Sequence, residues 1–241
     1  MAFRHSTIAV IPARNEAPFI GEVVRVARSH VARVFVVDDG SEDSTSVEAA
    51  AAGAEVISRL DFPGKGAAIK TGIRHAMSDP SWNHLLCLDG DGQHFPSEIP
   101  RLLAKADESD AGMIIGNRMH NPKGMPWIRR AVNRFVSREI CELCRQQLPD
   151  TQCGFRLFRR DLLPILLCDS SGFDYETEVL LLAARGGIKI ATVPVTSRYG
   201  AERSKINPIS DTIRYFALMH RYRRSAPAGI ESIEMPVESI R

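Results

Sequence analysis

The chain has 241 residues, 44% of them apolar and 25% charged, and its formal net charge is +2. This length allows one sizeable core, and the near-neutral charge argues against a chain that coats nucleic acid, so we expect no nucleic-acid partner. Residues 1–16 lack the apolar core of a secretory signal, and no window is apolar enough for a membrane helix. We therefore expect a cytoplasmic protein, or one that is peripheral on the cytoplasmic face of a membrane.

The five cysteines are an odd and sparse set for a disulfide scaffold and fit a reduced compartment. Cys141 and Cys144 form a CxxC motif, but they lie in a helical pattern with no second pair. Structural zinc sites need further ligands at a suitable spacing. The sequence therefore favours helix packing over zinc binding for this pair.

In the first half of the chain, short β-branched runs alternate with helical segments. We expect strands at residues 7–11, 31–37, 54–58, 84–88 and 112–116, and helices at residues 18–29, 44–52, 65–77 and 97–107. This alternation predicts a parallel sheet covered by helices on both faces. Ligands of such sheets bind beyond the carboxyl ends of the strands. The polar stretches "PARNE", "DDGSED", "DGDGQH" and "NRMH" all fall at these ends.

The second half is less regular. A basic amphipathic helix is expected from about residue 125 to residue 144, followed by a turn and strand in "DTQCGFRLFRRD". A helix in "FDYETEVLLLAARGG", a strand in "IKIATVPV" and a helix over residues 211–222 come next. Residues 226–241 show no periodicity, and we expect a flexible tail there after a single domain that spans residues 1–225.

The stretch "CLDGDGQHF" places two carboxylates, Asp89 and Asp91, directly behind a buried strand. Two residues apart in an extended segment, they point the same way, while Gly90 lets a ligand approach the backbone closely. Converging carboxylates repel unless a cation lies between them, and Mg²⁺ or Mn²⁺ shared with substrate phosphates fits. Gln93 is near enough to add a ligand. A plain acidic turn is the alternative, whereas the spacing does not match a calcium-binding EF-hand loop.

Two further turns lie near the same edge of the predicted sheet. Asp38 and Asp39 can accept hydrogen bonds from a ribose or a base, although helix capping is the competing interpretation of this turn. Lys65 begins a helix in "PGKG" and can meet a phosphate there, but the P-loop pattern is absent and a solvated lysine is equally compatible. The first turn also lacks GxGxxG, which disfavours a dinucleotide dehydrogenase and favours a sugar nucleotide bound with a metal.

Two segments of the second half are locally basic. Residues 118–145 hold seven basic and two acidic side chains, and residues 198–224 hold seven and two again, so each segment has a net charge of +5. Within the first, Arg130, Arg134 and Arg138 recur at helical spacing beside an apolar stripe. The members of that stripe are Val132, Phe135, Val136, Ile140 and Leu143. Such a helix can lie on an anionic membrane surface, and a packed helix with a solvated basic face is the alternative.

Six motifs in order carry a resemblance to a known family: "VIPARNEA", "VVDDGSEDST", "GKGAAIKTGI", "LDGDGQH", "DTQCGFRLFRRD" and "YGAERSKINP". Together they resemble the inverting GT-A glycosyltransferases, and within them the polyprenyl-phosphate (dolichol-phosphate-type) mannose, glucose and N-acetylhexosamine synthases. The resemblance covers about residues 6–220. It implies a Rossmann-like, mostly parallel α/β sheet with a nucleotide-sugar half at about residues 6–117 and an acceptor half at about residues 118–225.

The resemblance also implies roles for particular residues. Asp89 and Asp91 match the family's DxD acids, with Gln93 as a further metal ligand. The segments that hold the nucleotide are matched by Pro12, Ala13, Asn15, Glu16, Asp38 and Asp39. The segments that receive the lipid phosphate or the donor diphosphate are matched by Arg118, one of Arg129 and Arg130, and Arg198 with Ser204 and Lys205. Many relatives carry transmembrane helices after this domain, so the basic helix, the segment "YFALMHRYRR" or a membrane partner subunit would have to hold a lipid acceptor here.

The mechanism expected from these residues is electrostatic. A cation on the diphosphate neutralises the charge that develops on the leaving nucleoside diphosphate. A phosphate acceptor is already an anionic nucleophile, which arginines can position, so a general base is less necessary. Asp150 is the candidate base if the acceptor is a hydroxyl, and a turn residue before a strand is the alternative.

We therefore expect a metal-dependent transferase that moves a sugar from GDP-mannose, UDP-glucose or UDP-N-acetylhexosamine to a polyprenyl or dolichyl phosphate with inversion. A glycosyltransferase with a soluble or protein acceptor is the first alternative. A sugar-1-phosphate nucleotidyltransferase would need a glycine-rich basic loop after the first strand, and "PARNEAP" is not one. A catalytically silent nucleotide-binding module is disfavoured by the intact acids Asp89 and Asp91.

Overall fold

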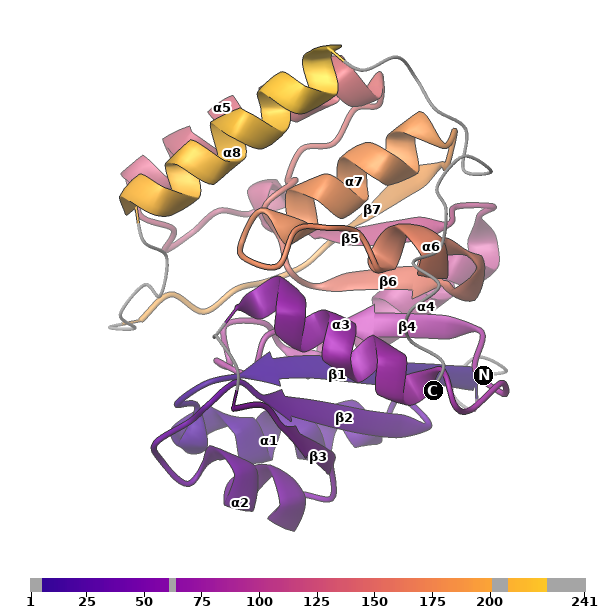
Figure 1. The fold of residues 1–241 in the computed structure, drawn as a ribbon, viewed down its shortest axis with the longest axis vertical. Helices are drawn as coiled ribbons and strands as arrows, with labels where there is room; N and C mark the ends of the chain where they lie inside the picture. Colours follow the sequence, from indigo (N-terminus) through magenta and orange to yellow (C-terminus); the bar gives the residue numbers. More distant parts are fainter. Residues whose placement is uncertain (1–5, 61–63, 201–207, 225–241) are drawn as a thin grey trace.

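A single seven-stranded sheet forms the centre of the computed structural model, which describes residues 6–60, 64–200 and 208–224 (Figure 1). The strands are β1 (Thr7–Ala13), β2 (Arg33–Asp38), β3 (Glu55–Ser58), β4 (His84–Cys87), β5 (Met113–Asn117), β6 (Arg156–Arg159) and β7 (Ile190–Pro194). Their spatial order is β3-β2-β1-β4-β6-β5-β7, and all neighbours are parallel except β6, which is antiparallel to β4 and to β5. The predicted mostly parallel α/β sheet is confirmed. The predicted tail, residues 226–241, lies outside the described residues.

Eight helices accompany the sheet in the described part of the chain. They are α1 (Ala17–Arg28), α2 (Thr45–Ala51), α3 (Lys65–Ala76), α4 (Ile99–Glu108), α5 (Trp127–Cys144), α6 (Leu163–Leu166), α7 (Tyr175–Arg185) and α8 (Pro208–Arg224). Short 3₁₀ turns lie at Pro96–Glu98, Arg118–His120 and Arg160–Leu162. The elements with predicted bounds are all present, whereas the sequence did not indicate the short helix α6.

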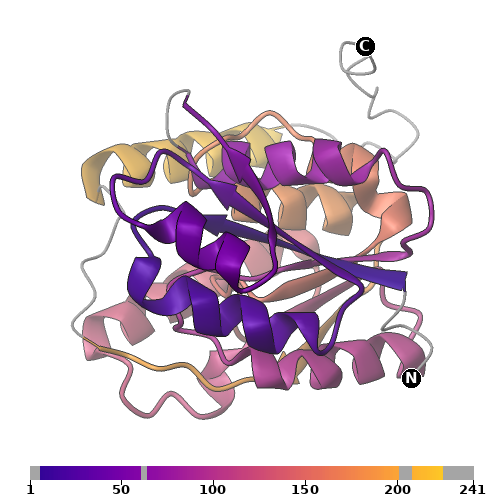
Figure 2. The same cartoon turned by 90° about the horizontal axis from the view of Figure 1, so that it is seen from below.

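The helices cover the sheet on both faces, with α3 and α7 on one face and α1 and α4 on the other (Figure 2). The central strands are therefore buried on both sides, which explains why β1, β2 and β4 are continuous apolar runs rather than alternating ones. Helix α1 shows the complementary pattern, because Ile20, Val23, Val24 and Ala27 recur at helical spacing and are all buried.

The direction of β6 decides what meets at the edge where the parallel strands end. Because β6 runs against its neighbours, its first residue, Arg156, pairs with Cys87 near the end of β4 and with Ile115 in β5. Residues 150–155, which precede β6, therefore lie at the same edge as the residues that follow β4 and β5. This places the motif "DTQCG" between Asp89 and Arg118.

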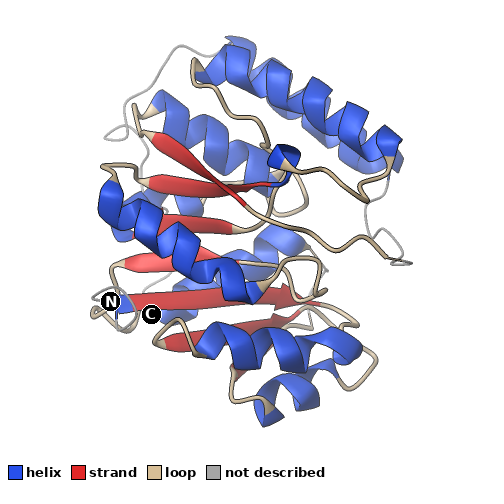
Figure 3. Cartoon of the chain, turned by 180° about the vertical axis from the view of Figure 1, so that it is seen from behind, coloured by secondary structure: helices blue, strands red, loops and turns tan. Residues whose placement is uncertain are grey.

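Helices α5 and α8 pack against α7 and lie side by side at the end of the molecule away from α2 (Figures 1 and 3). The apolar stripe predicted on α5 is divided between two environments: Val136 and Ile140 are buried, whereas Val132 and Phe135 are each 54% exposed. No helix in the described part of the chain combines the length and the apolarity that a membrane span requires.

Close packing of α3 on the sheet generates a stability prediction. A Cβ at Gly72 of α3 would lie 2.6 Å from Val10 Cγ1 and 3.0 Å from Val37 Cγ2, both in central strands. Gly72→Ala should therefore lower the free energy of unfolding by about 1–3 kcal/mol, as overpacking of a core does. The matched control is Gly21→Ala in α1, where the nearest atom is 3.6 Å away. That variant should gain up to about 1 kcal/mol from helix propensity. Urea denaturation measures both changes, and equal shifts would contradict the packing argument.

Candidate active site

The acidic turn that follows β4 (residues 89–93) is held in one conformation by a hydrogen bond within the turn and by a glycine. Asp91 Oδ1 accepts a hydrogen bond from the Gln93 amide at 2.9 Å, and Gly92 has a positive φ of 70°, which glycine adopts without strain. A Cβ at Gly90 would lie 3.1 Å from a methyl group of Ile20, so a side chain there would crowd the core. The turn therefore presents Asp89 and Asp91 from a fixed backbone at the edge of the sheet.

Lys65, at the start of α3, lies between two carboxylates. Its Nζ is 2.6 Å from Asp89 Oδ1 and 3.0 Å from Glu176 Oε1, which comes from the first turn of α7. Burial alone would raise the pKa of Asp89, but the neighbouring Lys65 ammonium outweighs it and holds that pKa below its ordinary value. Burial would lower the pKa of Lys65, yet the two carboxylates raise it above the usual lysine value. Asp89 and Lys65 are therefore both charged at neutral pH.

Gly154 leaves the space beside this charged triad open. A Cβ at this position would lie 2.8 Å from Asp89 Oδ2, 2.9 Å from Glu176 Oε1 and 3.0 Å from Lys65 Nζ. Only a glycine leaves the three groups in place, so the segment that precedes the antiparallel strand β6 contributes to the site through the absence of a side chain.

The oxygen atoms at this edge fit a hard divalent cation. Asp89 and Asp91 supply carboxylate oxygens, and Gln93 supplies an amide oxygen, which are ligands that Mg²⁺ and Mn²⁺ prefer. Among the described residues, no cluster of three or more His, Cys, Asp or Glu side chains is placed to hold a metal ion. Magnesium that is shared with substrate phosphates needs only one or two protein carboxylates. The acidic turn therefore fits a cation that is bound together with a phosphorylated ligand.

The turns after β1 and β2 are tied to each other by hydrogen bonds. Asn15, which has a positive φ of 53°, accepts a bond from the Glu42 amide at 2.8 Å and donates its own amide to Ser41 Oγ at 2.9 Å. The Glu16 amide donates to Thr45 Oγ1 at 2.8 Å. Pro12 and Ala13 form the end of β1, directly before this double turn. The predicted nucleotide-binding residues of the first two turns are thus brought together.

Asp38 and Asp39 both hold neighbouring backbone in place. Asp38 Oδ1 accepts from the Ser41 amide at 2.9 Å, and its other oxygen accepts from Ser46 Oγ. Asp39 pairs with Arg59 and accepts from the Gly64 amide at 2.7 Å. The second bond connects the turn after β2 with the loop that begins α3, so the position of Lys65 depends on Asp39.

Tight packing explains the glycines around Lys65. A Cβ at Gly64 would lie 2.6 Å from the Ser171 carbonyl oxygen, and one at Gly66 would lie 2.5 Å from Tyr175 Cβ. The amide of Ala67 donates to the same Ser171 carbonyl at 2.9 Å. These glycines let the start of α3 approach the segment before α7, and this approach brings Lys65 to Glu176.

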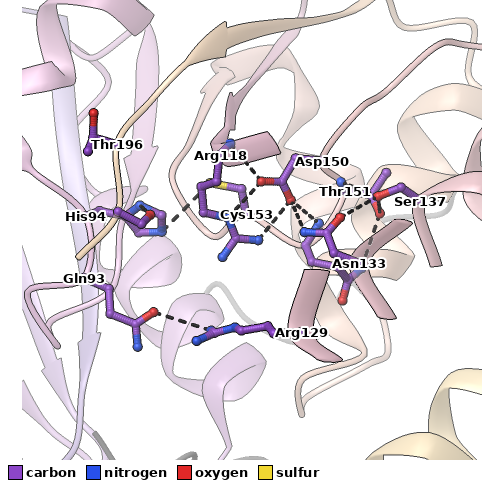
Figure 4. Close-up of polar contacts among 12 residues, drawn as sticks. Gln93, His94, Arg118, Arg129, Asn133, Ser137, Asp150, Thr151, Cys153 and Thr196 are labelled. Atoms are coloured by element: carbon purple, nitrogen blue, oxygen red, sulfur yellow. Dashed lines mark hydrogen bonds and ion pairs between the residues drawn. The ribbon is translucent and has the colours of Figure 1, made fainter. Parts of the chain in front are cut away.

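Arg118, which follows β5, and Asp150, in the turn before β6, form a buried ion pair at this edge of the sheet (Figure 4). Arg118 donates from its backbone amide at 2.9 Å and from Nε at 2.8 Å to Asp150 Oδ2, and from Nη2 at 2.9 Å to Oδ1. Asn133 of α5 donates to Oδ1 at 2.8 Å, and its own oxygen accepts from Ser137. The side chains of the pair are 6% and 0% exposed. This network joins the end of β5, the turn before β6 and α5.

This geometry argues against Asp150 as a general base. Burial alone would raise the pKa of its carboxyl, but the bonds from Arg118 and Asn133 hold that pKa below its ordinary value. A carboxylate that is stabilised in its charged form and surrounded by donors is a weak proton acceptor. Asp150 positions Arg118 instead, and Arg118 is itself only 5% exposed.

The more accessible arginines lie around Gln93. Arg129, in the first turn of α5, donates to Gln93 Oε1 at 3.4 Å, and its guanidinium lies 5.7 Å from the centre of the Tyr199 ring (Figure 4). The Arg198 amide donates to the Gln93 carbonyl at 2.9 Å, and its guanidinium lies over Phe95. Arg130 Nε is buried without a hydrogen-bond partner in the described part of the chain. Ser204 and Lys205 lie outside the described residues.

Comparison with known proteins assigns the family. Residues 8–166 match the family model "Glycosyl transferase family 2". This chain belongs to glycosyl transferase family 2. This glycosyltransferase is 31% identical over 222 residues to the glycosyltransferase AglJ of Haloferax volcanii, and the alignment covers 90% of this chain and 72% of AglJ. It is 30% identical over 207 residues to the polyprenol monophosphomannose synthase of Mycolicibacterium smegmatis, and that alignment covers 79% of this chain and 76% of the synthase.

A solved structure shares the fold. The glucosyl-3-phosphoglycerate synthase of Mycobacterium tuberculosis, in complex with Mn²⁺, UDP-glucose and phosphoglyceric acid, superposes on this glycosyltransferase with a TM-score of 0.66. The match covers 90% of this chain and 79% of that one, at 21% sequence identity. The GT-A fold expected from the sequence is therefore confirmed for this family 2 enzyme.

Three residues of the glycosyltransferase's charged edge were missed by the sequence reasoning. The sequence predicts only a helix around Glu176, although "FDYETE" gathers acids in a first helical turn. For Gly154 it predicts only a turn. Arg156 is 1% exposed and donates to the carbonyl oxygens of Thr151, Cys153 and Glu176, which holds "DTQC" beside α7. The direction of β6 brings these residues to the site, and single-chain periodicity carries no signal for it.

The buried pair generates a prediction for the stability of this glycosyltransferase. Asp150→Asn leaves Arg118 charged and buried without its counterion, so the free energy of unfolding at neutral pH should fall by about 3–5 kcal/mol. Asp161→Asn is the matched control, because Asp161 pairs with Arg159 at 2.7 Å while their side chains are 55% and 43% exposed. The control should lose less than about 1 kcal/mol. Equal losses in urea denaturation would show that the buried pair contributes no more than a surface pair.

Proposed function

We propose that this glycosyltransferase transfers a hexose from a nucleotide sugar to a polyprenyl or dolichyl phosphate, with inversion and with Mg²⁺ or Mn²⁺. The main observation that supports this proposal is the order of three sets of residues along one edge of the sheet. The double turn around Asn15 lies at one side, the acidic turn in the middle, and the basic group of Arg118, Arg129 and Arg198 at the other. The relationship to a polyprenol monophosphomannose synthase supports a lipid phosphate as acceptor.

The nucleotide sugar would lie across the first two turns with its diphosphate at the acidic turn. Asp89, Asp91 and Gln93 would hold the divalent cation, which when bound supplies Lewis-acid stabilisation of the leaving diphosphate. Lys65 adds a positive charge beside Asp89 that can interact with the same phosphates. In this proposal residues 6–117 bind the donor and residues 118–225 bind the acceptor.

The acceptor phosphate would be the nucleophile. One of its oxygens forms a bond to the anomeric carbon, while the bond from that carbon to the diphosphate breaks and the nucleoside diphosphate leaves. A phosphate oxygen is already anionic at neutral pH, so no side chain needs to remove a proton in this step. Arg129 and Arg198 would position the phosphate near the acidic turn, and Arg118 would add its charge from the buried pair.

The decisive experiment offers purified protein labelled GDP-mannose, UDP-glucose and UDP-N-acetylhexosamine, each with polyprenyl phosphate and with or without Mn²⁺. Organic extraction separates a labelled lipid from labelled donor. Metal-dependent label in the lipid supports the proposal. Transfer to phosphoglycerate or to another soluble acceptor, with none to lipid, would instead establish a glycosyltransferase with a non-lipid acceptor.

The metal role of Asp91 leads to a prediction for catalysis. Asp91→Asn removes a charge at the turn while keeping its shape, so turnover at saturating donor should fall by about 10²-fold or more, as with loss of other transition-state charge stabilisers. Asp110→Asn is the matched control, because its side chain is 78% exposed and precedes β5 at the opposite edge. Circular dichroism checks that both variants fold, and unchanged turnover in Asp91→Asn would refute the metal assignment.

The position of Arg129 beside Gln93 leads to a prediction for acceptor binding. Arg129→Ala should raise the KM for polyprenyl phosphate more than the KM for the donor, by about tenfold, since a charge-assisted hydrogen bond to an anion contributes about 1.5–3 kcal/mol. Arg74→Ala, an exposed residue of α3, is the control and should change neither constant. Initial rates over both substrates measure the effect, and a larger rise in the donor KM would place Arg129 at the diphosphate.

A further inference from the structure

The exposed apolar side chains of this protein are not scattered. Nine large apolar residues are exposed in the described part of the chain, and six of them lie on α5 or α8. These six are Trp127, Ile128, Val132, Phe135, Ile213 and Phe216. Single exposed apolar residues are ordinary, whereas a group of them marks an interaction surface. We name these six residues, with the arginines of the same two helices, the α5/α8 face.

On α5 the exposed apolar residues form one row. Ile128, Val132 and Phe135 follow the i, i+4, i+7 spacing of one side of a helix, and they are 58%, 54% and 54% exposed. Trp127 at the first position is 77% exposed. The buried residues Val136 and Ile140 lie on the adjacent side of α5, so the core covers only part of the apolar surface of this helix.

Helix α8 continues the surface beside α5. Ile213 is 64% and Phe216 is 55% exposed, and both line a hollow of about 580 Å³ together with Thr212, Ala217, Met219, His220 and Arg223. Arg223 of α8 pairs with Glu139 of α5, which joins the two helices (Figure 1). The two apolar rows therefore belong to the same end of the molecule.

The charges around the apolar rows decide between possible partners. Arg129, Arg134 and Arg138 are exposed on α5, and the Arg138 side chain is 80% exposed. Helix α8 adds Arg214 and Arg223, whose side chains are 57% and 52% exposed. An apolar strip bordered by arginines matches the interface of an anionic bilayer, where apolar side chains enter the acyl boundary and guanidinium groups stay at the phosphates. A second copy of the chain would bring the same positive charge and be repelled.

We propose that the α5/α8 face docks on an anionic lipid bilayer, with α5 and α8 lying in the plane of the interface. Trp127 would lie at the headgroup level, where tryptophan is enriched in membrane proteins. Trp127 and Ile128 directly precede Arg129, which contacts Gln93 at the acidic turn. Docking therefore brings the acidic turn to the membrane surface. That this would present the site to a lipid phosphate acceptor is the one part of the inference that rests on the proposed function.

The protein contains its own reporter for this orientation. It has two tryptophans: Trp127 is 77% exposed on the proposed face, and Trp82 is 1% exposed in the core. Mixing the full chain with vesicles of equal parts phosphatidylcholine and phosphatidylglycerol should shift the Trp127 emission to shorter wavelength. Brominated acyl chains should quench the shifted emission. Trp127→Phe should abolish both signals, since Trp82 stays buried.

Vesicle flotation of the full chain measures the strength of docking. Phe135→Ser combined with Phe216→Ser should lower the partition coefficient by at least tenfold, since less apolar surface enters the bilayer. Arg134→Gln combined with Arg138→Gln should lower the partition coefficient by about 30-fold, because each basic residue near an anionic surface contributes about 1 kcal/mol. Raised salt should also weaken the binding of the wild-type protein. The matched controls are Val47→Ser on α2, which is 67% exposed, and Arg74→Gln on α3, and neither should change partitioning.

Three outcomes would overturn the proposal. The first is wild-type protein that does not float with anionic vesicles. The second is flotation that the controls lose as much as the face variants. The third is a dimer in light scattering that the Phe135/Phe216 variant disrupts while vesicle binding is absent, which would assign the face to a second copy. The vesicles contain no polyprenyl phosphate and no donor, so flotation tests docking alone. Docking of a protein that transfers no sugar in the separate labelled-donor assay would sustain this inference and refute only the proposed function.

Discussion

The arrangement of the site depends on the buried ion pair between Arg118 and Asp150. Its two members come from the end of β5 and from the turn before β6, and Asn133 connects both to α5. A buried guanidinium without a carboxylate would cost several kcal/mol, so these three elements must keep their relative positions for the protein to fold. The rest of the basic side of the edge, including Arg129 on the first turn of α5, takes its place from this network.

A second electrostatic constraint organises the acidic side. Lys65 lies between Asp89 and Glu176, and Gly154 leaves the space beside all three groups open. Each member comes from a different part of the chain: the start of α3, the turn after β4, the start of α7 and the turn before β6. Arg156 fixes the last two relative to each other through three carbonyl oxygens. The protein thus holds these groups in place before any phosphate arrives, which limits the reorganisation that binding requires.

The two constraints share one cause, the antiparallel strand β6 between β4 and β5. If β6 ran parallel to its neighbours, Asp150 and Gly154 would lie at the opposite edge, and neither Arg118 nor the charged triad would be completed. The Arg118–Asp150 network also sets the orientation of α5, because Asn133 and Ser137 on the buried side of this helix belong to it. The exposed side of α5 carries the row of uncovered apolar residues. The site and the α5/α8 face are therefore linked through one helix.

The local patterns of the sequence predicted much of this protein: the alternation of strands and helices, the turns that carry Asn15, Asp38 and Asp89, and the excess of arginine in the second half. These features are local, because periodicity, turn chemistry and charge are properties of neighbouring residues. Only the tertiary structure decided the direction of β6, the pairing of Asp150 with Arg118, the contribution of Glu176, and which half of the α5 apolar stripe the core would bury. Strand order and direction arise from contacts between residues far apart in the chain, and no window of a single sequence contains both partners of such a contact.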